Sequence, residues 1–111
     1  MNTTVSLTEL AASELASAVA SNNGRSAVTV CGGRDARLRQ TVMALRAGEG
    51  LAEHSSPGEA TLQVIVGRIV LRTTDQSWEG TPGDLLPIPA EVHAVDALDD
   101  SAILLTVVQS H

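Results

Sequence analysis

Short runs of β-branched and aliphatic residues, each closed by glycine or proline, make up most of this chain of 111 residues. After Gly24 the hydrophobic pattern takes the period of two that is typical of strands. Turn residues interrupt the pattern at 32–35, 48–50 and 55–58. We expect strands over residues 26–31, 36–46, 60–66, 68–73, 85–88, 92–95 and 102–108. Many short strands with such punctuation predict an all-β sandwich or barrel.

The first residues carry a different signal, because their apolar positions recur at spacings of three and four. Ser6 followed by Glu9 fits a capping box, in which a hydroxyl and a carboxylate satisfy backbone N–H groups at a helix start. Residues 22–24, Asn-Asn-Gly, are expected to end the helix. We therefore expect an N-terminal helix and linker over 1–24, packed on a sheet or a partner subunit, and a β-barrel over 25–111.

Composition narrows the possible partners. The formal net charge is −6 and the chain has no lysine, which disfavours nucleic-acid binding. Trp78 is the sole aromatic residue, so base stacking, a cation cage and an aromatic membrane belt are disfavoured. No segment is long and apolar enough for a membrane span or a signal peptide, and a cytoplasmic location is expected. The core must be aliphatic, and such a barrel can leave a cavity that no ring fills.

Two single residues receive local interpretations. Cys31 is the one cysteine and ends an apolar run, so we expect a small buried hydrophobe rather than a nucleophile. Trp78 lies in the polar, turn-rich stretch 74–83, where it is expected to anchor a loop or contribute to an interface.

Two segments, 48–67 (GEGLAEHSSPGEATLQVIVG) and 83–93 (GDLLPIPAEVH), resemble the two motifs of the cupin superfamily. The strongest parts of the resemblance are the strand–Gly67–strand hairpin and the Gly-Asp-x-x-x-Ile-Pro that is followed closely by His93. The resemblance covers roughly residues 36–108. It implies a double-stranded β-helix, the cupin or jelly-roll barrel, here with one N-terminal α-helix, and it implies a homodimer.

In metal-binding cupins the first motif supplies two histidines and a glutamate, and the second motif supplies a third histidine. Carried over to this chain, His54 and His93 match two of these ligands, whereas Ser56 and Ala60 stand at the other two positions. The resemblance therefore implies an incomplete metal site, and no cofactor is expected. If Fe, Mn, Ni or Zn binds, His54 and His93 are the expected ligands.

The predicted pocket follows from strand alternation, which places Ala60, Leu62, Val64 and Val66 on the inner face and Glu59 on the opposite one. The expected ligand-binding residues are His54, Ser56, Ala60, Leu62, Val64 and His93. Asp96 could orient His93 only through a turn, because three residues along a strand reach the opposite face.

Three functional hypotheses remain open. The first is a small-molecule-binding cupin that holds a largely apolar ligand without a complete metal site. The alternative is an enzyme, which is either metal-dependent and dioxygenase- or isomerase-like, or metal-free with His54 and His93 as acid and base. The third is a structural dimer that acts as an accessory subunit. The sequence identifies neither the ligand, nor a reaction, nor its catalytic residues.

Overall fold

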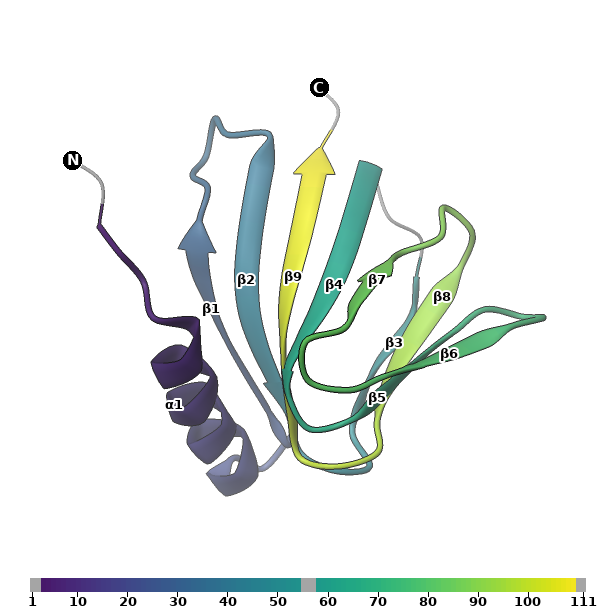
Figure 1. The fold of residues 1–111 in the computed structure, drawn as a ribbon, viewed down its shortest axis with the longest axis horizontal. Coiled ribbons are helices and arrows are strands. Elements are labelled where there is room, and N and C mark those ends of the chain that lie inside the picture. The colour runs from purple at the N-terminus through teal and green to yellow at the C-terminus, as the bar shows by residue number, and fades with distance from the viewer. Residues whose placement is uncertain (1–2, 55–57, 110–111) are drawn as a thin grey trace.

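The computed structural model describes residues 3–54 and 58–109, and in this part of the chain one helix and nine strands form (Figure 1). The elements are α1 (Leu7–Ala20), β1 (Arg25–Cys31), β2 (Leu38–Leu45), β3 (Gly50–His54), β4 (Gly58–Val66), β5 (Ile69–Arg72), β6 (Ser77–Gly80), β7 (Leu85–Pro87), β8 (His93–Ala97) and β9 (Ser101–Gln109). The prediction of an all-β fold with one N-terminal helix is confirmed.

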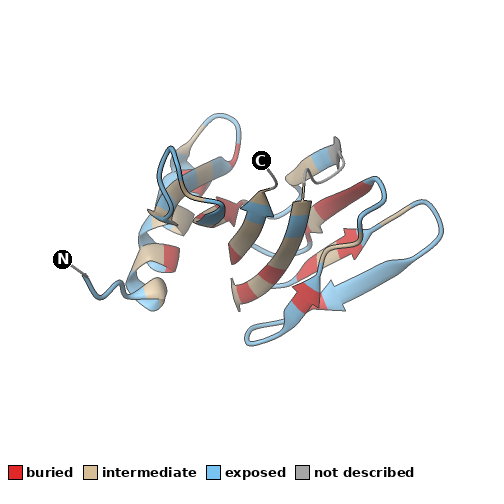
Figure 2. Ribbon diagram, turned by 90° about the horizontal axis from the view of Figure 1, so that it is seen from above, coloured by how far each residue is buried: buried red, intermediate tan, exposed pale blue. Residues whose placement is uncertain are grey.

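The strands form two antiparallel sheets that face each other as a sandwich (Figure 1). The five-stranded sheet has the order β1-β2-β9-β4-β7, and the four-stranded sheet has the order β3-β8-β5-β6. Side chains from both sheets meet in an aliphatic core, which consists of Leu62, Val64, Ile69, Leu71, Leu86, Val95 and Ile103. Figure 2 shows buried residues on strands of both sheets, with exposed residues along the outer strands and loops. The expectation of a core without aromatic rings is met in these residues.

Helix α1 covers the outer face of the five-stranded sheet. Its N-cap is Ser6, whose Oγ accepts a hydrogen bond from the backbone N–H of Glu9, as the capping pattern predicts. The contact with the sheet is built from small side chains that have no exposed surface, namely Ala11, Ala18, Ala44 and Ala102. Alanines on both sides let the helix lie close to the strands.

The prediction that Val66 faces inward is wrong. Val66 packs against the alanine cluster beneath α1, whereas Val64 lies in the core between the sheets. The cause is a register shift between Val64 and Val66 in the pairing of β4 with β9. Such a bulge interrupts the alternation of faces on which the prediction rested.

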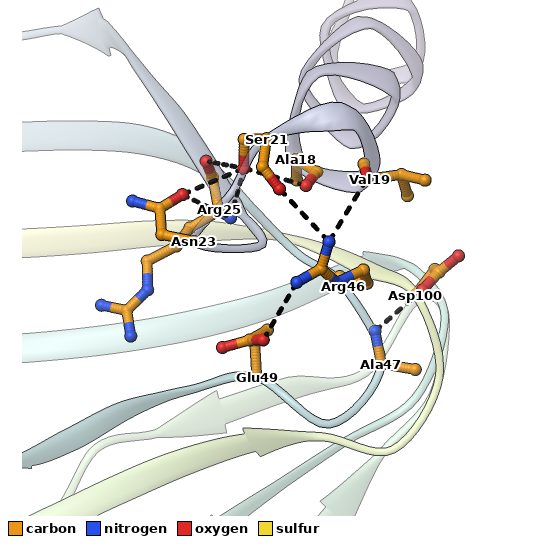
Figure 3. A network of polar contacts seen from close by, with 9 residues as sticks. All are labelled: Ala18, Val19, Ser21, Asn23, Arg25, Arg46, Ala47, Glu49 and Asp100. Atoms are coloured by element: carbon orange, nitrogen blue, oxygen red, sulfur yellow. Dashed lines mark hydrogen bonds and ion pairs between the residues drawn. The ribbon is translucent and has the colours of Figure 1, made fainter.

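Hydrogen bonds and an ion pair of Arg46 hold the C-terminal end of α1 against the strands (Figure 3). The guanidinium donates hydrogen bonds to the carbonyl oxygens of Val19 and Ser21 and pairs with the carboxylate of Glu49 at 3.3 Å. The last carbonyls of a helix lack partners within it, and a cation there also meets the negative end of the helix dipole. Ser26 adds a second link, because its hydroxyl donates to Glu14 on the helix at 2.5 Å.

Two strands lie where no strand was predicted, so Trp78 is not in a loop, and the prediction that Cys31 is buried is also wrong. Residues 74–83 contain β6, so Trp78 sits on an edge strand opposite Leu71, with 39% of its surface exposed. Strand β3 was also missed, because glycines and polar residues flank it. Cys31 is exposed at the end of the edge strand β1, not buried.

In the described part of the chain, no helix is long and apolar enough to cross a membrane.

Candidate functional site

His93 begins β8 and is almost completely buried, with 2% of its surface exposed. It lies two residues before Val95, a core residue, so strand alternation places both on the inner face of the four-stranded sheet. The imidazole Nδ1 lies 3.0 Å from the carbonyl oxygen of Glu91. Since a carbonyl can only accept, the hydrogen of this contact is on Nδ1.

His54 ends β3 and lies opposite His93 in the ladder between β3 and β8. The register is irregular here: Leu51 pairs with Val95, but the next recorded pair is His54 with His93. Two residues of β3 therefore oppose one residue of β8, which is the pattern of a β-bulge. In an unbroken ladder Glu53 would stand opposite His93. The bulge thus brings the backbones of the two histidines singled out in the sequence directly together.

The other predicted pocket residues occupy different environments. Leu62 and Val64 have no solvent-accessible surface and form part of the packed core. Ala60 is partly buried near the start of β4, on the same face by alternation. Ser56 lies outside the described residues. Leu62 and Val64 are therefore part of the packed core rather than accessible walls of a pocket.

Sequence reasoning missed three partly buried residues that pack at the edge of this core: Met43, Leu51 and Ile88. Leu51 was missed because its strand was not predicted. Met43 lies in the strand predicted over residues 36–46, but no sequence signal indicated which face of this strand is the inner one. These flexible or aliphatic side chains pack against the core cluster that includes Leu62 and Val64.

Two carboxylates near the motifs are directed elsewhere. Asp96 accepts a hydrogen bond from Nε of Arg72 at 2.6 Å, while His93 is bonded to a backbone carbonyl, so the sequence-level idea of an Asp96–His93 pair finds no support. Glu59 is exposed and stands opposite Val108 in the ladder between β4 and β9. Among the described residues, no group of three or more His, Cys, Asp or Glu side chains is arranged to hold a metal ion.

Comparison with solved structures identifies the architecture. A conserved protein of unknown function from Streptococcus pyogenes superposes with a TM-score of 0.77 at 23% identity, covering 100% of this chain and 90% of that one. A cupin superfamily protein from Desulfitobacterium hafniense gives a TM-score of 0.67 at 20% identity, covering 76% of this chain and 78% of the other. The chain has the cupin fold.

A larger cupin also contains this unit. Salicylate 1,2-dioxygenase from Pseudoaminobacter salicylatoxidans matches with a TM-score of 0.68 at 21% identity, over 78% of this chain and 26% of the enzyme. No protein-family model matches the sequence, and no curated protein matches it either. At these identities the likeness establishes the cupin barrel, which the two sequence motifs had predicted. The chemistry at His93 has to be argued from the residues themselves.

Proposed function

We propose that this cupin binds a small, largely apolar molecule inside the barrel, next to His93 and His54, without a complete metal site. The observation that carries the proposal is the setting of His93: a buried imidazole on the same strand face as Val95, which belongs to the aliphatic core. A ligand there would meet aliphatic surface and the imidazole of His93, whose Nδ1 contacts the carbonyl oxygen of Glu91. This combination of apolar walls with few polar groups is typical of small-molecule sites.

The residues at the metal-ligand positions of the cupin motifs favour binding of an organic molecule over metal chemistry. The cupin metal pattern needs four ligands, and Ser56 and Ala60 occupy two of those positions. Glu59 does not replace the missing carboxylate, because it belongs to the face of β4 opposite Leu62 and Val64. Two imidazoles alone are a weak site for catalytic iron or manganese. We place the protein in the cytoplasm, in accord with its single cysteine and acidic composition.

Benzyl alcohol tests the proposal as a small neutral probe, followed by saturation-transfer NMR. Its ring protons are easily observed because Trp78 and three histidines are the only aromatic side chains in the protein. We expect saturable binding that His93→Leu weakens at least about threefold, the effect of losing one hydrogen bond. Cys31→Ala, on the exposed end of β1, is the matched control and should bind as the unmodified protein does. Equal binding by His93→Leu would contradict the proposal.

The metal-dependent alternative has a separate test. The protein is purified without metal, reconstituted with Fe²⁺, Mn²⁺, Ni²⁺ or Zn²⁺ and subjected to elemental analysis. We expect less than stoichiometric metal in every case. Stoichiometric metal that disappears in the His54→Ala/His93→Ala double variant would replace the binding proposal with a metal enzyme.

We also propose that two copies associate through the inner side of β1. This strand is an edge of the five-stranded sheet, and its alternate residues Arg25, Ala27 and Thr29 are exposed. Arg25 and Ala27 border a groove of about 220 Å³ that Met43 and Leu51 also line. An exposed edge strand beside apolar surface is a ready site for pairing, and a second copy is the occupant that the cupin resemblance favours.

A further inference from the structure

A second hollow lies on the outer face of the five-stranded sheet, on the side away from the core. It is a groove of about 390 Å³ at strands β4, β7 and β9. Thr61 pairs with Thr106, and Glu59 pairs with Val108, so these four residues form adjacent rows on one face. Leu62 and Val64, which alternate with them along β4, point into the core. These four residues therefore face away from His93, while Ala60 and Ile88 line the groove from the side of the core.

The walls of this groove are apolar and are formed where the chain leaves β7. Pro87 stands opposite Thr61 in the ladder, and Ile88 and Ala90 continue the wall. The backbone N–H of Ile88 donates to the carbonyl of Ala60 at 3.0 Å, which holds the wall against β4. A volume of this size accommodates a small organic molecule rather than a single ion.

The polar groups of the groove have a defined arrangement. Gln40 on β2 donates from Nε2 to Oγ1 of Thr106 at 3.1 Å. Because this oxygen already accepts, the Thr106 hydroxyl is suited to donate its own hydrogen. Glu59 is the charged residue among the described groove residues, and its carboxylate has no arginine within ion-pair distance in the described part of the chain.

We propose that this groove binds a small primary amine with an aliphatic body. The ammonium group pairs with the Glu59 carboxylate, and the hydrocarbon part lies against Val108, Pro87 and Ile88. An additional hydroxyl or ether oxygen on the amine would accept from Thr106.

The chemistry of the lining also favours a primary amine over a quaternary one. Quaternary ammonium ions are held by cages of aromatic rings, and the groove contains none. A primary ammonium instead offers three N–H donors to the Glu59 carboxylate. The expected preference is therefore primary amine above neutral alcohol, with the trimethylated amine weakest because it has no N–H to donate.

Cyclohexylamine is the probe that tests this inference, titrated into the ¹⁵N-labelled full chain. We expect saturable shifts of the Thr61, Thr106 and Val108 amides, weaker shifts with cyclohexanol, and none with trimethylcyclohexylammonium. Equal affinity for cyclohexylamine and cyclohexanol would overturn the proposal. So would shifts confined to His93 and Val95, which would place the amine at the inner site. If the amide shifts of the groove residues change with protein concentration in the absence of amine, the groove is a contact with a second copy. That result would also overturn the proposal.

Substitutions identify the carboxylate. Glu59→Gln keeps the size of the side chain and should weaken cyclohexylamine binding about fivefold, as expected for one partly solvated ion pair. Thr106→Val should weaken an amino alcohol more than the plain amine. Glu9→Gln on α1 removes a carboxylate outside the groove and is the matched control. An unchanged affinity in Glu59→Gln would overturn the assignment, whereas His93→Leu should leave amine binding intact whether or not the inner site binds a ligand.

Discussion

His54 lies directly opposite His93 on neighbouring antiparallel strands, because one extra residue in β3 shifts the register between Leu51 and His54. Directly opposed residues in such a ladder have Cα atoms about 4.5–5.5 Å apart. The two histidines that match the cupin motifs thus lie opposite each other because of a β-bulge, and regular pairing would not place them there.

This register predicts a specific cross-link. In a Cys31→Ser background, His54→Cys/His93→Cys should form a disulfide on mild oxidation, because the expected Cα separation falls within the range of about 4.4–6.8 Å that disulfides require. Non-reducing mass spectrometry measures the cross-linked fraction. The matched control Glu53→Cys/His93→Cys should cross-link much less, and an equal or larger yield from it would refute the bulge.

Arg46 is predicted to contribute to global stability through the helix end. Arg46→Ala removes the donor to Val19 and Ser21 and the ion pair with Glu49, so we expect a loss of about 1–2 kcal/mol in the free energy of unfolding. Urea denaturation followed by circular dichroism measures this loss. Arg34→Ala, in an exposed turn, should change stability by less than about 0.5 kcal/mol. Equal effects of the two substitutions would show that the network adds nothing to stability.

The turn at Gly67 allows a prediction about the stability cost of adding a single Cβ. Gly67 has a φ of 87°, and a Cβ there would overlap Oγ of Ser101 and the carbonyl oxygen of Asp100. That hydroxyl is bonded to both N–H and C=O of Arg68, at 2.9 and 3.1 Å. Gly67→Ala should therefore cost more than about 3 kcal/mol, combining backbone strain with a displaced hydrogen-bond network.

Gly48→Ala is the control for that prediction. Gly48 has nearly the same φ, 89°, but nothing lies within 4 Å of the point that a Cβ would occupy. Only the cost of the left-handed backbone applies there, about 1–2 kcal/mol. Thermal or urea unfolding of both variants separates the steric part from the backbone part, and similar losses would contradict the crowding at Gly67.

Association through β1 is predicted to be sensitive to charge at its exposed inner face. Light scattering at micromolar concentration should give the mass of a dimer for the unmodified protein. Ala27→Glu should give the monomer mass, because it brings two carboxylates together in an apolar contact. Ala12→Glu, on the exposed side of α1, should remain dimeric. A monomer mass for the unmodified protein would exclude the interface.

Much of the barrel was predictable because its signals are local. The period-two runs, the Ser6 cap and the glycine turns each act within a few residues, and the strands they predicted are present with small differences at their ends. Strand β3 was missed because it is held by β8, which is distant in sequence, and β6 was missed because it is short and lies in a polar stretch, although it forms a hairpin with β5. Trp78, for example, lies on a strand only because β6 pairs with β5.

The candidate site was harder to predict because it depends on irregular pairing. The motifs singled out His54 and His93, but only the register of β3 against β8 brings their backbones together. Similarly, the bulge that turns Val66 toward α1 leaves no clear mark in the local sequence. The groove at Glu59 was missed since its floor combines β4 with β9, whose paired residues lie far apart in the sequence.

The edge position of Trp78 also determines what the intrinsic fluorescence of this protein measures. Its only indole is 39% exposed on β6, outside the aliphatic interior. Intrinsic fluorescence therefore senses the water and the contacts at one margin of the four-stranded sheet, and its emission should already resemble that of a partly hydrated ring in the native state. Tryptophan fluorescence will therefore respond to changes at that edge of the sheet, whereas the packed interior contributes no tryptophan signal.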